Sequence, residues 1–308
     1  MASGGYAWWY LDALSDDGRH ALVVIAFIGS VFSPYYAWAR RRGLADALQH
    51  VAVNVALYSP GGGPGARGAM TERGAAALQR CAHTLAIGPS ALHWDGSALV
   101  VTLDERCMPM PRRLRGTLRL QPQAMGAPAP LGLDSAGAHQ WWPIAPRARI
   151  DVDLREPGWR WQGDAYLDSN CGAVPLEQSF SRWQWARASL GSSHSAVVYD
   201  AVQGDGVQRH IALQFGAQGG CQAFDASPMQ PLPAAPVFRL PRGQRSDAGS
   251  APQVLHTLED TPFYARSLVQ SQWGGQPVLA VHESLDLERF SRPLVQAMLP
   301  FRMPRRAR

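Results

Sequence analysis

Lysine is absent from this sequence, so all 29 of its basic residues are arginine, and charged residues make up only 17% of its 308 positions. An average soluble domain carries about 25% charged residues. A disordered chain needs many charges and few apolar side chains, whereas 46% of this chain is apolar. The net charge of +5 is small for this length and does not by itself indicate a nucleic acid partner. The composition therefore predicts a folded protein with a sizeable apolar core, and we expect it to bind no nucleic acid.

Cysteine and long apolar runs are also scarce. The four cysteines, at positions 81, 107, 171 and 221, form no Cys-X-X-Cys pair and no zinc-ligand spacing, so we expect free thiols of a cytoplasmic protein. The longest apolar run, residues 21–32, is too short for a membrane-spanning helix and follows aspartates rather than the basic segment of a signal peptide. We expect this run to form a strand buried on both faces.

What the sequence does contain is an apolar alternation with a period of two, which is typical of β-strands. The clearest case is the pair Asp95-Gly96 between two apolar runs, because Asp-Gly adopts the positive φ of a tight hairpin turn at low cost. Turns at 204–206 and 274–275 predict two more hairpins. Helices are expected only at residues 44–50, 71–85 and 292–299. Many short strands separated by turns indicate an all-β fold, a sandwich or a barrel.

A segment rich in Pro, Ala and Gly at residues 121–138 has the composition of a connection. The chain on each side of this segment opens with aromatic strands and continues through hairpins that contain glycine. We therefore expect two β domains packed side by side, formed by residues 1–145 and residues 146–308. No motif can be placed in residues 219–260, which are rich in Pro and Ala.

Tryptophan is concentrated in one part of the chain, since six of the 11 lie between residues 141 and 185. Residues two apart on a strand share a face, which pairs His139 with Trp141 and Tyr166 with Asp168. A carboxyl group among aromatic rings has a raised pKa, and the π faces of the rings can stabilise a cation. The pattern also fits a Trp-filled core in which Asp168 begins a turn, so at this point both interpretations stay open.

Four segments of the chain resemble the carotenoid 1,2-hydratases, also called hydroxyneurosporene synthases, of purple photosynthetic bacteria. These segments are residues 5–18, 28–38, 166–170 and 182–185. The resemblance covers nearly the whole chain and implies two lipocalin-like domains, in a wider family that also includes pericyclases. It further implies that the functional residues are His139, Trp141, Tyr166 and Asp168.

The resemblance implies addition of water across the terminal 1,2 double bond of an acyclic carotenoid such as neurosporene or lycopene. Asp168, kept protonated by burial, would protonate C2 of the substrate. Trp141 and Tyr166 would stabilise the tertiary cation at C1 through their ring faces, and His139 would orient the water or accept its proton. No electron transfer occurs in this reaction, so we expect neither a redox cofactor nor a metal.

Three other functions remain open from the sequence: a non-catalytic lipocalin-like carrier of hydrophobic isoprenoids, a pericyclase of the same fold, and a carbohydrate-active β-sandwich. A glycosidase usually needs two facing carboxylates, and Asp164 is the only obvious second acid near Asp168. Arginine clusters at 40–42, 112–115 and 302–308 would attract anionic headgroups, and a water-insoluble substrate must arrive from a bilayer. We therefore expect peripheral contact with lipid of the inner, photosynthetic membrane.

Overall fold

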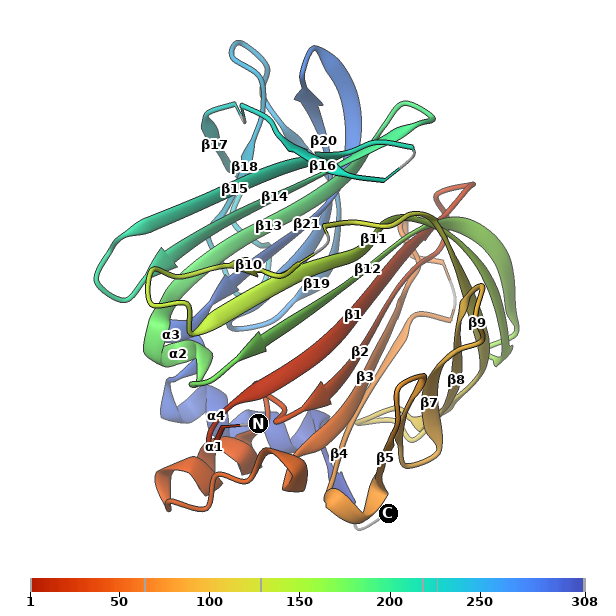
Figure 1. The fold of residues 1–308 in the computed structure, drawn as a ribbon, viewed down its shortest axis with the longest axis vertical. Helices are drawn as coiled ribbons and strands as arrows, with labels where there is room; N and C mark the ends of the chain where they lie inside the picture. Colours follow the sequence, from red (N-terminus) through yellow and green to blue (C-terminus); the bar gives the residue numbers. More distant parts are fainter. Residues whose placement is uncertain (1, 64, 128, 218, 226, 307–308) are drawn as a thin grey trace.

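The structure, a computed structural model, describes residues 2–63, 65–127, 129–217, 219–225 and 227–306. Strands dominate it and form two large sheets, while a few short helices gather at one end of the molecule (Figure 1). This arrangement confirms the all-β fold expected from the alternation of apolar residues. Among the described residues, no helix is long and apolar enough to cross a bilayer.

The first sheet has 13 strands in the order β22-β4-β3-β2-β1-β12-β11-β9-β8-β7-β6-β5, with β10 paired to β11. Neighbours are antiparallel, except that β22 and β4 run parallel. Figure 1 shows this sheet curling from β1 through β12 and β11 towards β9, β8 and β7. Its strands are β1 (Tyr6–Ser15), β2 (Ala21–Ile28), β3 (Val51–Tyr58), β4 (Arg67–Arg73), β5 (Leu78–Arg80), β6 (Thr84–Ile87), β7 (Ser90–Trp94), β8 (Leu99–Arg106), β9 (Arg113–Ala124), β10 (Leu131–Gly132), β11 (His139–Glu156), β12 (Trp159–Gly172) and β22 (Arg305–Arg306).

The second sheet has seven strands in the order β16-β15-β14-β13-β21-β20-β19, and a separate ribbon pairs β17 with β18. Its strands are β13 (Phe180–Leu190), β14 (His194–Gln203), β15 (Gln208–Phe215), β16 (Cys221–Ala223), β19 (Gln253–Asp260), β20 (Tyr264–Trp273) and β21 (Gln276–Asp286). The ribbon consists of β17 (Met229–Leu232) and β18 (Arg242–Arg245). Residues 219–260, for which the sequence predicts no motif, therefore supply strands at the edge of this sheet and the ribbon.

The predicted hairpins are confirmed as β7–β8, β14–β15 and β20–β21, and the apolar run at residues 21–32 forms β2 over most of its length. The helices are α1 (Pro34–Arg41), α2 (Leu176–Ser179), α3 (Leu287–Phe290) and α4 (Pro293–Arg302). The helix expected at 292–299 is confirmed as α4. The one expected at 44–50 is only a 3₁₀ turn at Ala47–Gln49.

The helix expected at residues 71–85 is wrong, because this segment forms the end of β4, a 3₁₀ turn at Ala75–Ala77, β5 and the start of β6. β4 pairs with β3, and its Glu72 and Arg73 bind the buried side chains of His50 and Glu105. These tertiary contacts hold the segment extended and override the helix propensity of the alanines that follow.

The expected boundary between residues 145 and 146 lies inside β11, a strand of the first sheet. The chain passes from one sheet to the other later, between the end of β12 at Gly172 and the start of β13 at Phe180. The segment 121–138 likewise joins two strands that are neighbours in the first sheet, β9 and β11. The division into two domains at this boundary stays a prediction.

Strand alternation on β1 separates two apolar layers. Tyr6, Trp8 and Tyr10 belong to a core cluster shared with the second sheet, which also includes Trp183 and Trp185 of β13. The intervening positions, such as Leu11 and Ala13, belong to a second cluster inside the curl of the first sheet. The layer between the sheets is therefore rich in aromatic side chains.

Candidate active site

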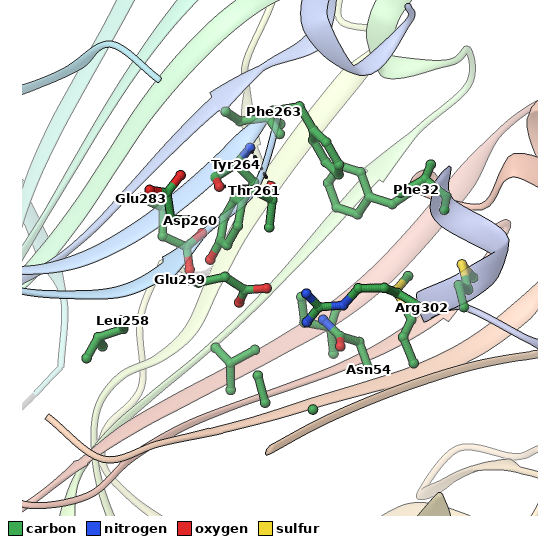
Figure 2. Close-up of a pocket in the computed structure, with 18 of the residues that line it drawn as sticks. Phe32, Asn54, Leu258, Glu259, Asp260, Thr261, Phe263, Tyr264, Glu283 and Arg302 are labelled. Carbon is green, nitrogen blue, oxygen red and sulfur yellow. Dashed lines mark hydrogen bonds between the residues drawn. The ribbon is translucent and has the colours of Figure 1, made fainter. Parts of the chain in front are cut away.

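A cavity of about 850 Å³ opens in the layer between the two sheets. This volume lies in the range of about 300–1,000 Å³ found for small-molecule sites. Most of its lining is aromatic or aliphatic, with side chains from β1, β2, β12, β13, β14 and α4. In Figure 2, Glu259, Tyr264 and Glu283 of the second sheet lie across the cavity from Asn54 and Arg302. The cavity therefore suits an apolar ligand with few polar groups.

Asp168 of β12 lies in the wall of this cavity, and only 4% of its surface is exposed. Its Oδ2 accepts two hydrogen bonds of 2.8 Å, from the Trp141 indole N–H and from the Tyr166 hydroxyl. The other oxygen, Oδ1, is buried and has no hydrogen-bond partner among the described residues. Because Oδ2 already accepts two hydrogen bonds, Oδ1 is the atom that can carry a proton.

Burial raises the pKa of Asp168 to about 8, since water is excluded from its charged form. The hydrogen bonds from Trp141 and Tyr166 lower the pKa, while the nearby charges of Glu283 and Asp12 raise it. The net effect is a carboxyl group that is mostly protonated near neutral pH. A protonated carboxyl group in an apolar cavity can act as a general acid.

Trp141 and Tyr166 lie behind Asp168 rather than in the cavity wall. Both are fully buried, and neither is among the described residues that line the cavity. Trp141 lies on β11, where it is paired with Asn170 of β12, so the antiparallel register brings its indole next to the Asp168 carboxyl group. Sequence spacing placed Tyr166 beside Asp168, and the structure adds that both aromatic residues bind the carboxyl group through their polar hydrogens.

Among the expected site residues, His139 lies farthest from Asp168 in the strand register. It begins β11 and pairs with Gly172, four positions after Asp168 on β12. Its Nδ1 lies 2.8 Å from the Tyr6 hydroxyl and its Nε2 lies 2.8 Å from the Ser179 hydroxyl. A Cβ on Gly172 would lie 2.5 Å from the Tyr6 ring and 2.6 Å from His139 Nδ1, so only glycine fits there. Burial lowers the pKa of His139, and His139 is not among the described residues that line the cavity.

The aromatic rings that do line the cavity near Asp168 come from both sheets: Tyr10, Trp183, Trp185 and Tyr199. The Trp185 ring lies 5.4 Å from that of Tyr10, and Trp183 lies 5.7 Å from Tyr199. Trp183 and Trp185 follow the strand spacing visible in the sequence. Tyr10 and Tyr199 carry no such signal, because their place depends on which strands become neighbours.

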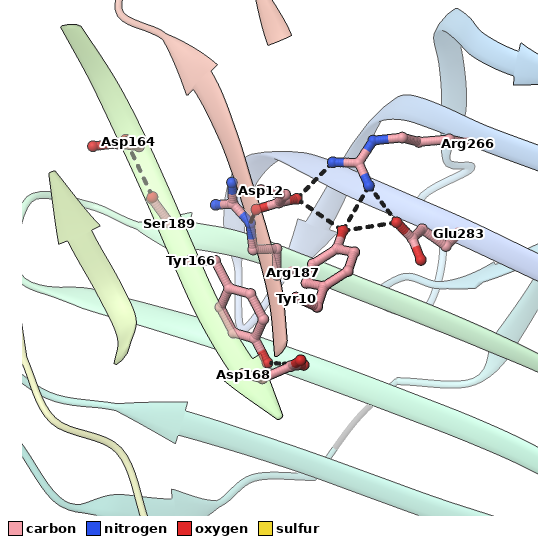
Figure 3. Close-up of polar contacts among 9 residues, drawn as sticks. All are labelled: Tyr10, Asp12, Asp164, Tyr166, Asp168, Arg187, Ser189, Arg266 and Glu283. Atoms are coloured by element: carbon pink, nitrogen blue, oxygen red, sulfur yellow. Dashed lines mark hydrogen bonds and ion pairs between the residues drawn. The ribbon is translucent and has the colours of Figure 1, made fainter. Parts of the chain in front are cut away.

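A buried network of charges adjoins this site and joins the two sheets (Figure 3). Asp12 of β1 accepts hydrogen bonds from Arg187 of β13 at 2.5 Å and from Arg266 of β20 at 2.7 Å. Arg266 also pairs with Glu283, and the Tyr10 hydroxyl donates to Glu283 at 2.7 Å. Sequence reasoning missed this network, because its members are far apart in the chain and match no motif.

The sequence profile of the carotenoid hydratase CrtC family matches residues 24–308. Acyclic carotenoid 1,2-hydratase of Thiocapsa roseopersicina is 52% identical over 99% of this chain and 74% of its own length. The protein of the same name from Rubrivivax gelatinosus is 49% identical with the same coverage. The crystal structure of a candidate AttH protein of Nitrosomonas europaea is similar in fold alone, with a TM-score of 0.61 and 14% identity over 91% of this chain and 92% of that one. The chain therefore belongs to the carotenoid hydratase family.

Proposed function

We propose that this protein adds water across the terminal 1,2 double bond of an acyclic carotenoid, with Asp168 as the proton donor. Membership of the hydratase family and the names of its relatives support the substrate class. The observation that carries the catalytic assignment is the Asp168 carboxyl group, buried in the wall of an apolar cavity with one oxygen held and the other unpaired.

The proposed reaction has two steps. The Oδ1–H bond of Asp168 breaks as the π electrons of the alkene form a C–H bond at C2, which leaves a tertiary cation at C1 and a carboxylate on Asp168. The oxygen of a water molecule then bonds to C1, and the proton it loses returns to Asp168. The reaction converts one alkene and one water molecule into one alcohol, and no substrate is oxidised or reduced.

Trp141 and Tyr166 act on the acid in this proposal. Their two hydrogen bonds to Oδ2 stabilise the carboxylate that forms when the proton leaves, so they assist transfer to a weakly basic alkene. Stabilisation of the cation falls to ring faces in the cavity wall, where Trp185 and Tyr199 are available. A cation over such a face gains about 1–2 kcal/mol when it is desolvated.

We assign to Asn170 the role of binding the water molecule that reacts with the cation. This residue lies two positions after Asp168 on β12, is 3% exposed and lines the same cavity. Its side-chain N–H₂ group has no partner within 3.5 Å among the described residues and interacts with the Tyr199 hydroxyl, so the two groups together can hold a water molecule beside Asp168. His139 then has an indirect role: it binds Tyr6, whose ring stacks at 4.9 Å on Trp8 of the cavity wall.

The test is Asp168→Asn, which keeps the shape and can still accept from Trp141 and Tyr166 but has no acidic proton. We expect a loss of about 10²–10⁴-fold in turnover of lycopene, measured as product heavier by one water. The matched control is Asp164→Asn on the same strand face, because its carboxyl group is 53% exposed and pairs with Arg149. Near-normal turnover of folded Asp168→Asn would exclude the acid role.

The same assay separates the other functions of such a cavity. A carrier would bind the carotenoid and return it unchanged, and a pericyclase would give a product of unchanged mass.

We also propose that the protein works as a peripheral protein at the cytoplasmic face of the photosynthetic membrane, because an acyclic carotenoid dissolves in lipid rather than in water.

A further inference from the structure

We propose that the outer face of α4, together with the adjoining loop at Val237, docks on a bilayer that contains anionic lipid and places the cavity mouth against it. This docking face consists of Val237, Leu294, Met298 and Phe301. The inference deepens the proposed function, since it assumes that the substrate is a lipid-dissolved apolar molecule, but the docking itself does not depend on the reaction.

The docking face is apolar where a surface helix normally turns polar side chains to water. Leu294, Met298 and Phe301 are spaced by four and three residues, so they share one side of α4. Their exposed fractions are 73%, 45% and 75%. The inward side of α4 is already packed, because Val295 and Gln296 are buried. The outer stripe is therefore not needed to pack α4 against the rest of the fold.

The docking face borders the mouth of the cavity. Met298 and Phe301 line the cavity and are exposed at the same time, and so is Phe238, next to Val237. The loop is held in place, since Asp260 accepts from the backbone N–H groups of Val237 and Phe238, and Arg289 donates to the Phe238 carbonyl at 2.9 Å. An apolar molecule leaving a bilayer at this point would enter the cavity without crossing water.

Charge along the segment that carries α4 is of one sign, whereas Asp260 lies beside the loop at Val237. The last 20 residues, 289–308, contain six arginines and no acidic residue. Arg292 and Arg302, at the two ends of α4, are exposed and form no ion pair within the described part of the chain, and Arg302 lies at the cavity wall. Anionic headgroups would supply the missing partners. A second copy of the chain would instead oppose one set of arginines to another, which argues against a dimer through this face.

The test measures flotation of the purified protein with vesicles of phosphatidylcholine, with or without phosphatidylglycerol. We expect binding to the anionic vesicles at low ionic strength and weaker binding at high ionic strength. The variant Val237→Ser with Leu294→Ser should lower the partition by about tenfold, because two apolar side chains no longer enter the interface. Neither residue lines the cavity, so hydration of substrate supplied in detergent should be unchanged. Leu279→Ser is the control, since Leu279 is an exposed leucine (43%) on β21.

Three results would overturn this inference: no flotation of the wild-type protein with anionic vesicles, equal flotation of the double variant, or a double variant that changes only the oligomeric state. Failure of the proposed function has a different signature. In that case Asp168→Asn would remain active, or the wild type inactive, while the flotation results would stand.

Discussion

Tyr166→Phe removes one of the two hydrogen bonds to Oδ2 of Asp168. We expect this change to shift the alkaline limb of the pH–rate profile to higher pH. Hydration needs Asp168 protonated, so the rate should fall as the pH rises through the pKa of this group, which burial raises to about 8. The Tyr166 hydroxyl stabilises the carboxylate and lowers that pKa. Without it the pKa rises further, and the rate should fall only at a higher pH.

The size of the effect follows from the strength of the lost bond. A hydrogen bond to a charged group contributes about 1.5–3 kcal/mol, and one pH unit corresponds to about 1.4 kcal/mol. The alkaline limb should therefore move by about 1–2 pH units. The maximal rate should fall by about tenfold or more, because the same hydroxyl stabilises the carboxylate that forms during proton transfer.

The assay is the initial rate of alcohol formation from detergent-dispersed lycopene, followed by chromatography over the pH range in which both proteins stay folded. Tyr35→Phe is the matched control, because Tyr35 lies on α1 and is not among the described residues of the cavity wall. A limb that stays in place, or moves to lower pH, would refute the view that Tyr166 acts through the acidity of Asp168.

Two further predictions concern stability. The free energy of unfolding of Asp168→Asn should increase relative to that of the wild type as the pH rises from about 4 to about 8, by up to about 1.4 kcal/mol per pH unit. The reason is that over this range the folded wild type keeps a proton on Asp168 that the unfolded chain has lost, so the wild type becomes less stable. Urea unfolding at a series of pH values tests this, and parallel stability curves would contradict it. Arg266→Met should lower the free energy of unfolding by about 3–5 kcal/mol, because it removes the cation paired with Glu283 and leaves Asp12 with only one of its two arginines, Arg187. Arg160→Met is the control for the same measurement, since the Arg160 side chain is 80% exposed and its ion pair should contribute less than about 1 kcal/mol. Equal losses in the two variants would show that the buried network does not stabilise the fold.

Local pattern predicts local structure in this chain, and long-range pairing decides the rest. The turn at Asp95-Gly96 and the shared face of Tyr166 and Asp168 follow from spacing alone, and both are present. The extended form of residues 71–73 depends on pairing with β3, which spacing does not reveal. The missed helix α1 did have a local signal, because Ser33 caps it and Pro34 occupies its first turn.

The candidate site shows the same division. Aromatic content and the resemblance both indicated Asp168 and its neighbours on β11 and β12. The register that pairs Tyr10 of β1 with Asp168 joins positions far apart in the chain, and no periodicity encodes it. Asn170 and Tyr199 enter the site in the same way, because the association of the two sheets decides which buried polar groups share a cavity.

The charges beside Asp168 determine whether this acid stays neutral without becoming too weak to react. Asp12 and Glu283 each raise the pKa of Asp168, and unpaired they would add a strong repulsion to the effect of burial. Arg187 and Arg266 bind them at short range, so two negative and two positive groups largely cancel and burial remains the main cause. A carboxyl group with a pKa close to the working pH both keeps its proton and releases it, whereas a much higher pKa would make proton transfer to an alkene harder. The same ion pairs join β1 to β13 and β20, so the contacts that hold the two sheets together also keep the acid between them reactive.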